Sequence, residues 1–142
     1  MPTRTSSAEW QGDLKGGSGE LSLGSGAFSG SYSFVSRFES GEGTNPEELL
    51  AAAHAGCFSM SLSNMLAQAG TPATSVRTEA SVTLDTVDGA PKITKVVLST
   101  VGSVPGIDET EFLAKAEAAK EGCPVSKLFT GAEIELDATL SS

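Results

Sequence analysis

Alternating apolar and polar positions predict a pair of long strands in the second half of the chain. In residues 75–87 every second side chain is apolar or small over most of the segment, which is typical of a strand with one solvated face. Asp88-Gly89 is a hairpin signal, although the Ala90-Pro91 that follows would lengthen the loop, and residues 93–102 form the returning strand. Residues 131–140 predict a last strand, with an inner face made of Ala132, Ile134, Leu136, Ala138 and Leu140.

The first forty residues carry a weaker strand pattern that is broken by glycine. We expect three antiparallel strands here, and the last of them is the segment SYSFVSRFE. Read as a strand, this segment places Tyr32, Phe34 and Phe38 on one face and Arg37 on the other.

Capping residues mark the start of a long helix at Thr44. Asn45 can cap the helix, Pro46 suits its first position, and Glu48 stands three residues after the cap, as in a capping box. The helix should run to about Gln68, because Gly70 follows soon after.

Two further helical segments lie near the end of the chain. Asp108 and Glu111 form a second N-cap signature, and Gly122 ends the helix that follows them. A third helical turn begins at Cys123-Pro124. Strands, helix, strands, helix and strand predict an α+β fold, and without a repeat or a long linker we expect a single domain over residues 1–142.

Composition and charge exclude several classes of partner. The chain has 142 residues and a formal net charge of −9, and its basic residues do not cluster, so binding to nucleic acid or to an anionic membrane is not expected. No signal peptide is recognisable, and His54 and several serines interrupt the longest apolar stretch, so we expect no membrane-spanning helix and a cytoplasmic location. In that compartment two cysteines are more often redox-active or metal-binding than a permanent disulfide.

The environment of Cys57 raises the question of how this thiol could react. The only potentially charged side chain between Ala51 and Leu66 is His54, and burial in apolar surroundings raises the pKa of a thiol. Reactivity would need a cation from elsewhere, and Arg37 is the most suggestive one because it lies within an aromatic segment. Glu47 and Glu48 are nearby carboxylates that could hold this arginine, and Glu47 is the freer one if Glu48 caps the helix.

Cys123 has a different setting, at the start of a helical turn. Free backbone N–H groups there favour a thiolate. Structural readings stay open at this point: either cysteine could simply pack as a small hydrophobic side chain, and His54 could be an ordinary interior histidine. A structural zinc site is not expected, since one histidine and two distant cysteines do not provide four closely spaced ligands.

Four stretches of the chain resemble the OsmC/Ohr family, in its osmotically inducible protein C branch. They are SRFE, GTNPEELLAAAHAGCFSMSLS, VPGID and GCPVSK, and the similarity covers nearly the whole chain in order. The loop GSGAFSG departs from the family in being unusually rich in glycine and serine, which leaves the first hairpin less certain. The resemblance implies a tightly intertwined homodimer in which curved antiparallel sheets wrap two central buried helices, with active sites at the subunit interface.

The resemblance also implies an activity and the residues that perform it. The family consists of thiol-dependent peroxidases that reduce organic hydroperoxides, and by position Cys57 matches the peroxidatic nucleophile and Cys123 its resolving partner. Arg37 and Glu47 match the arginine and glutamate of the site. A Cys57 sulfenic acid would condense with Cys123 to a disulfide, which an external dithiol, of lipoyl type, would reduce. No metal or other cofactor is implied.

Helix geometry sets one difficulty for this site. In an unbroken helix Glu47 and Cys57 lie ten residues, or about 15 Å, apart along the axis. Either the helix breaks between them, or the Arg37-Glu47 pair meets Cys57 of the other subunit. We expect Leu50, Phe58 and Met60 to line an apolar entry for the substrate. Two other functions remain open: a cysteine-based redox sensor, and a non-enzymatic binder of small apolar molecules.

Overall fold

Three short antiparallel strands begin the chain, which confirms the predicted number, but the third ends at Tyr32 and does not include most of SYSFVSRFE. The structure, a computed structural model, describes residues 1–141. Strand β1 (Ser6–Gln11) pairs with β2 (Ser18–Leu23), and β2 pairs with β3 (Ser29–Tyr32). The rings of Trp10 and Tyr32 meet across this small sheet, with centroids 5.3 Å apart. Such aromatic pairs are among the contacts that stabilise a sheet with little apolar surface of its own.

The segment after Tyr32 is helical, and the expectation that it continues the strand is wrong. Helix α1 (Phe34–Phe38) begins after Ser33, whose hydroxyl accepts a hydrogen bond from the Ser36 backbone N–H, while the Ser36 hydroxyl accepts one from the Ser33 backbone N–H. This reciprocal capping box satisfies two backbone donors at once and makes the turn favourable. The Ser36 hydroxyl in turn donates to the Thr44 carbonyl at 2.7 Å.

Helix α2 (Pro46–Gln68) follows the predicted bounds closely. The side chain of Asn45 accepts a hydrogen bond from the Glu48 backbone N–H at 2.7 Å, which confirms it as the cap. By length and composition alone, its 23 residues are apolar enough to cross a membrane. This is weak evidence for a span, because the core helix of a soluble protein passes the same test.

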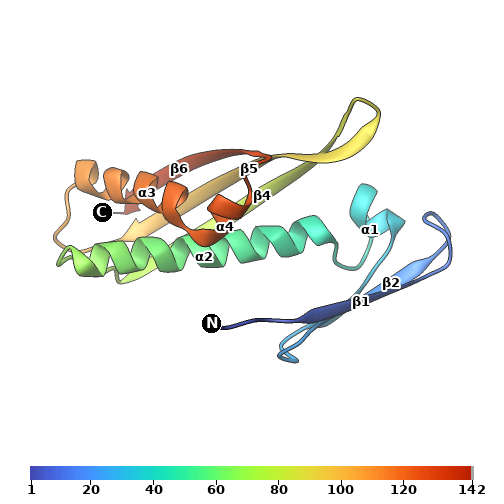
Figure 1. The fold of residues 1–142 in the computed structure, drawn as a ribbon. Coiled ribbons are helices and arrows are strands. Elements are labelled where there is room, and N and C mark those ends of the chain that lie inside the picture. The colour runs from blue at the N-terminus through green and yellow to red at the C-terminus, as the bar shows by residue number, and fades with distance from the viewer. Residues whose placement is uncertain (142) are drawn as a thin grey trace. The chain divides into compact units, whose positions relative to one another are not determined.

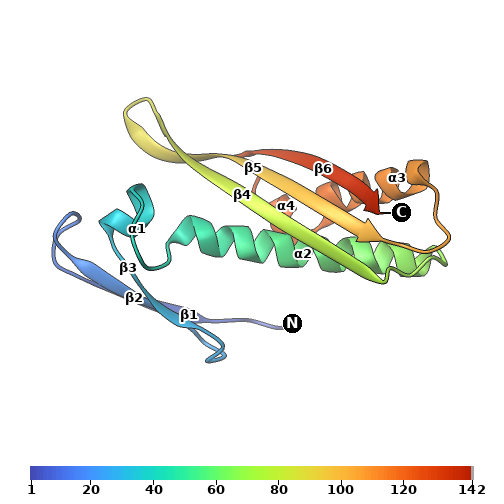
Figure 2. The same ribbon diagram turned by 180° about the vertical axis from the view of Figure 1, so that it is seen from behind.

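The second half of the chain forms a three-stranded sheet with helices on one of its faces (Figure 1). Strand β4 (Ser75–Val87) pairs antiparallel with β5 (Ala90–Ser103), and β5 pairs parallel with β6 (Glu133–Ser141). Figure 2 shows the same sheet from its uncovered side, with the helices behind it. The parallel pair needs a crossover, which helices α3 (Glu109–Gly122) and α4 (Pro124–Leu128) provide.

The hairpin between β4 and β5 is tighter than predicted. Asp88 and Gly89 are its two loop residues, with φ angles of 53° and 80°, and Val87 already pairs with Ala90. Positive φ at both central residues is the geometry of a two-residue turn that matches the twist of the flanking strands. Pro91 does not lengthen the loop, because it takes a place in the ladder opposite Thr86.

A single apolar core lies between the helices and the sheet of this second half. It is built from α2, β5 and α3, and its fully buried members include Phe58, Leu62, Leu66, Val96, Leu98, Phe112, Ala116 and Ala119. The α2 members recur every four residues, which places them on one face of the helix. Cys123 belongs to the same core and is fully buried. The core therefore fixes α2 and the start of α4, the two segments that carry the cysteines.

By internal contacts the chain divides into two compact units, Met1–Leu49 and Leu50–Ser142. The first unit contains the small sheet, α1 and the first residues of α2. The second contains the rest of α2, the larger sheet, α3 and α4. Each unit holds a different part of the candidate site.

Candidate active site

The two cysteines lie together in the second unit, although 66 positions separate them in sequence. Cys57 is on the core side of α2 and half-buried, and Cys123 is the fully buried cap of α4. Both are free thiols, and Cys57 packs against the core cluster that contains Cys123. The Cys123 thiol is close enough to affect the Cys57 thiol through a hydrogen bond and through charge. The structure therefore brings the two sulfurs within reach of each other.

The surroundings of Cys57 disfavour its thiolate. Burial is the largest cause and raises the pKa of this thiol, and the hydrogen bond and charge of Cys123 raise the pKa further. The backbone N–H of Val125 opposes them by favouring the charged form. Within residues 50–141 no basic side chain contributes to this pKa. The activating cation inferred from the sequence therefore stays a prediction.

Cys123 has hydrogen-bond partners within its own turn. As the cap of α4 it accepts a hydrogen bond from the Ser126 backbone N–H, with Sγ 3.4 Å from the nitrogen. The Ser126 hydroxyl lies 3.1 Å from the same sulfur. The predicted cap position is thus present, and a side-chain hydroxyl adds to the backbone donor.

His54 completes this cluster from α2. Its Nε2 lies 2.7 Å from the Ser126 Oγ, and its ring meets the edge of Phe129 with centroids 5.3 Å apart. The side chain is fully buried, which lowers the pKa of its imidazole and favours the neutral ring. The sequence predicted an interior or interface histidine with its hydrogen bonds satisfied; the structure confirms the interior position, but Nδ1 has no partner among the described residues. The sequence did not indicate Ser126, whose only signal is its place three residues after Cys123, where a cap finds its partner.

The predicted Arg37-Glu47 pair forms in the first unit. Arg37 Nε donates to one carboxylate oxygen of Glu47 at 3.1 Å, and Nη2 donates to the other at 3.0 Å. Glu47 is buried, whereas about a third of the Arg37 side chain remains exposed. The glutamate therefore holds the guanidinium in a two-point geometry and leaves part of it available.

An aromatic pocket surrounds the exposed part of Arg37. It has a volume of about 200 Å³, and besides Arg37 it is lined by Trp10, Leu14, Tyr32, Ser33, Phe34 and Phe38. The guanidinium carbon lies 5.3 Å from the centroid of the Phe38 ring. A cation inside an apolar pocket is a feature of sites that take a ligand with both a polar and an apolar part.

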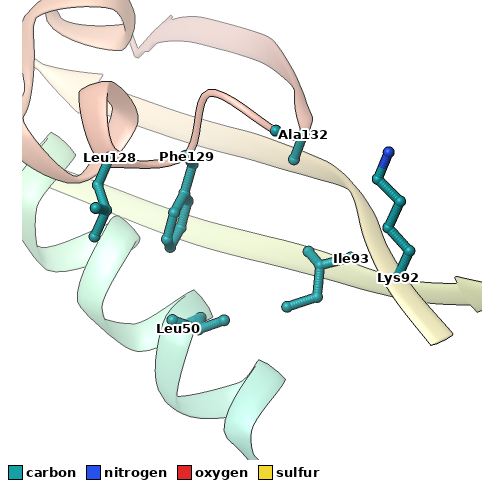
Figure 3. A pocket seen from close by; sticks show the side chains of 7 residues that line it. Leu50, Lys92, Ile93, Leu128, Phe129 and Ala132 are labelled. Carbon is teal, nitrogen blue, oxygen red and sulfur yellow. The ribbon is translucent and has the colours of Figure 1, made fainter.

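A second apolar pocket lies in the other unit, and Phe129, whose ring meets that of His54, is one of the residues that line it. Figure 3 shows Leu50, Ile93, Leu128 and Phe129 around this pocket of about 280 Å³, with the chain of Lys92 at its rim. Of the three predicted entry residues, Leu50 lines this pocket. Phe58 is fully buried in the core and cannot line an entry, and Met60 is 77% exposed.

Comparison with known proteins places the chain in a family. Residues 39–138 match the family model described as OsmC-like protein. The chain belongs to the OsmC-like family. This confirms the resemblance that the sequence motifs indicate.

Two curated relatives and a solved structure agree with this assignment. The chain is 51% identical over 136 residues to the peroxiredoxin OsmC of Escherichia coli (strain K12), covering 95% of this chain and 94% of that protein. It is 31% identical over 104 residues to the organic hydroperoxide resistance protein of Xanthomonas axonopodis pv. citri (strain 306), covering 71% and 68%. An organic hydroperoxide resistance protein from Elizabethkingia anophelis superposes with a TM-score of 0.76 at 21% identity over 99% of each chain, so the α+β fold is that of the OsmC/Ohr proteins.

Proposed function

We propose that this protein is a thiol peroxidase that reduces organic hydroperoxides to alcohols. The observation that carries the proposal is the meeting of Cys57 and Cys123 in one buried cluster as two free thiols. The names of the curated relatives, a peroxiredoxin and an organic hydroperoxide resistance protein, support the same peroxide-related redox chemistry.

The reaction runs through the two sulfurs in turn. The Cys57 thiolate attacks the terminal oxygen of ROOH, the O–O bond breaks, and the products are ROH and a Cys57 sulfenic acid. Cys123 then attacks the sulfenic sulfur, water leaves, and a Cys57-Cys123 disulfide forms. An external dithiol, which we expect to be of lipoyl type, reduces this disulfide and restores both thiols. These steps require no metal or other cofactor.

Arg37 is the proposed activator of Cys57, and Glu47 is its holder. Because the pKa of Cys57 is raised by burial, the thiolate needs a positive charge beside it, and Arg37 keeps about a third of its side chain free for that role. The apolar pockets around Arg37 and beside Leu50 would take the organic group of the substrate. Leu50 and Cys57 are seven residues, two helical turns, apart on α2 and therefore share a face.

A homodimer would resolve the distance between Glu47 and Cys57. Helix α2 is unbroken from Pro46 to Gln68, so the alternative of a helix break does not apply. We therefore propose that Arg37 and Glu47 of one subunit serve Cys57 of the other, within a single OsmC-like domain per chain. The outer face of α2 supports a dimer, since it exposes small or apolar side chains at Ala52, Ala53, Gly56 and Met60 that a second helix could cover.

Turnover with a matched pair of peroxides and reductants tests the proposal. Catalytic amounts of protein should consume an organic hydroperoxide faster than hydrogen peroxide, and a lipoyl-type dithiol should sustain turnover better than a glutathione supply. A single stoichiometric oxidation without turnover would favour a redox sensor instead. A protein that binds small apolar molecules equally well after both cysteines are alkylated, and consumes no peroxide, would be a carrier.

A further inference from the structure

The side chains of His54 and Ser126 form a hydrogen-bonded chain that ends on the Cys123 sulfur. The His54 Nε2 lies 2.7 Å from the Ser126 Oγ, and that oxygen lies 3.1 Å from Cys123 Sγ. All three residues are buried, with His54 and Cys123 fully so. The mechanism above uses Cys123 but gives no task to the two polar side chains behind it.

The unpaired nitrogen of His54 determines which atoms donate in this series of hydrogen bonds. Among the described residues, His54 Nδ1 is the buried side-chain nitrogen or oxygen that has no hydrogen-bond partner. A buried N–H without a partner is costly, and the proton of a neutral imidazole is placed by the bond that each nitrogen makes. The proton therefore belongs on Nε2, which donates to Ser126 Oγ, and the serine hydroxyl then donates to Cys123 Sγ. The sulfur receives two donors, the hydroxyl and the backbone N–H of Ser126.

We infer that His54 and Ser126 make Cys123 the leaving group when the disulfide is reduced, an inference that rests on the proposed function. Cys57 is half-buried and Cys123 fully buried, so an external dithiol reaches the Cys57 sulfur. Its thiolate attacks Cys57 Sγ, the Cys57-Cys123 bond breaks, and the electron pair of that bond goes to Cys123 Sγ. The products are a mixed disulfide on Cys57 and a Cys123 thiolate, and the second thiol of the dithiol then releases Cys57.

The donors lie where the charge develops in this step. Thiol-disulfide exchange is faster when the leaving sulfur carries its negative charge at lower cost. In the reduced protein Cys123 Sγ rests against the Ser126 hydroxyl and N–H, so the charge arrives at preorganised donors. Ser126 contacts the reacting sulfur directly, and His54 acts as a positioning residue by fixing the direction of the serine hydroxyl.

The test measures reduction of the disulfide separately from peroxide chemistry. The Cys57-Cys123 disulfide is formed with diamide, which needs no peroxidase activity, and its reduction by dithiothreitol is followed by mass spectrometry of quenched samples. Ser126→Ala keeps the backbone donor but loses the hydroxyl, and His54→Leu removes the side chain that orients it. Each substitution should slow reduction about tenfold. Because the reduced form loses hydrogen-bond donors, the reduction potential of the disulfide should also fall, by about 30 mV for a tenfold change in the equilibrium constant.

Two further variants separate a positioning role from a packing role. In His54→Gln the amide nitrogen can replace Nε2 as donor, so reduction should stay within about threefold of the unchanged protein. Ser59→Ala removes a hydroxyl of the same helix that bonds Thr78 at 2.7 Å, and it should leave the rate and potential unchanged. Equal rates and potentials in Ser126→Ala and in the unchanged protein would overturn the inference, as would equal slowing in Ser59→Ala. If His54→Leu does not fold, Ser126→Ala decides alone.

The outcome does not depend on whether the protein reduces peroxides. If the unchanged protein fails to consume any hydroperoxide, the proposed function fails, while the diamide experiment still shows whether Ser126 and His54 govern the departure of Cys123. If the protein turns over peroxide but all variants are reduced at the same rate, the proposed function stands and the leaving-group role is refuted.

Discussion

The Arg37-Glu47 pair allows the structural and catalytic parts of one contact to be separated. Two hydrogen bonds of 3.0 and 3.1 Å join a buried carboxylate to a guanidinium that is about a third exposed. Removing one partner of a fully buried pair costs about 3–5 kcal/mol, whereas an exposed pair contributes about 0–1 kcal/mol. For this half-exposed geometry we expect Arg37→Met to lower the free energy of unfolding by about 2 kcal/mol, because Glu47 is left buried and charged.

A double-mutant cycle measures this coupling. Urea denaturation at one fixed protein concentration is carried out for Arg37→Met, Glu47→Gln and the double variant. Since Glu47→Gln removes the buried charge, the double variant should recover at least half of the stability that Arg37→Met loses. Peroxide turnover should not recover with it, because the cation that we propose activates Cys57 is still missing.

Two results would contradict this reasoning. A coupling energy below about 0.5 kcal/mol would mean that the pair contributes no more than an ordinary surface contact. An alkylation rate of Cys57 with the same pH dependence in Arg37→Met as in the unchanged protein would exclude Arg37 as the activating cation. If Arg37 has that role, the profile should move to higher pH in the variant, and peroxide reduction should slow by on the order of a hundredfold.

The remaining predictions concern the cysteines, the dimer and the buried histidine. After one equivalent of organic hydroperoxide, mass spectrometry should find Cys57→Ser unmodified and Cys123→Ser with added oxygen on Cys57. Oxygen on Cys123 in Cys57→Ser, with peroxide consumed at the rate of the unchanged protein, would mean that the roles of the two cysteines are reversed. Sedimentation should show a dimer, and Gly56→Arg on the exposed face of α2 should convert it to a monomer; a folded, fully active monomer without this change would refute the interface site. Burial lowers the pKa of His54, so below about pH 6.5 the unfolded chain binds a proton at this site more readily than the folded chain does. The free energy of unfolding should therefore fall as pH drops below about 6.5, by at most about 1.4 kcal/mol per pH unit. Denaturation of His54→Gln across this range should lack that component.

Local signals predicted most of the secondary structure. The bounds of α2 and α3 follow from their caps, Asn45 and Asp108, because each provides an oxygen that a backbone N–H of the first turn can use. The alternating pattern of residues 75–87 correctly predicts strand β4, in which half-buried and exposed positions alternate over most of the length. These features depend on neighbours in sequence, which is why a single sequence reveals them.

The segment Phe34–Phe38 shows where local pattern is ambiguous. Its two aromatic residues lie four positions apart, a spacing that fits one face of a strand and one face of a helix equally well. The capping box of Ser33 and Ser36 stabilises the helical alternative. The three-residue spacing of these serines is the spacing of that motif and is visible in the sequence. Asp88-Gly89 likewise predicts the tight turn, but the expectation that Ala90-Pro91 lengthens the loop is wrong, because Pro91 pairs with Thr86 in the ladder.

The candidate site could be predicted only in part, because its contacts join distant segments. The sequence resemblance, not residue spacing, indicated that Cys57 and Cys123 belong together, whereas the expected capping role of Glu48 already favoured Glu47 as the partner of Arg37, and the resemblance agreed. The contact of His54 with Ser126 spans 72 positions and has no local signature on the histidine side. It follows from the packing of α4 against α2 and became visible only in three dimensions.

The two sulfurs differ in a way that matches the order of the proposed reaction. Cys57 has its thiolate disfavoured by burial and by Cys123, and its one favourable neighbour in the same unit is the Val125 N–H. The raised pKa disfavours the Cys57 thiolate, and under the proposed mechanism this thiol would react in an assembled site that includes Arg37. In the reduced protein Cys123 has a hydroxyl and a backbone N–H on its sulfur, with His54 behind the hydroxyl. Under this division, assembly of the site controls the attack on peroxide, whereas the interior of one subunit controls the release of the resolving sulfur. Substitutions at Arg37 should therefore slow the oxidative half of the cycle and substitutions at Ser126 the reductive half, and a variant that slows both halves equally would show that the two sulfurs are not controlled separately.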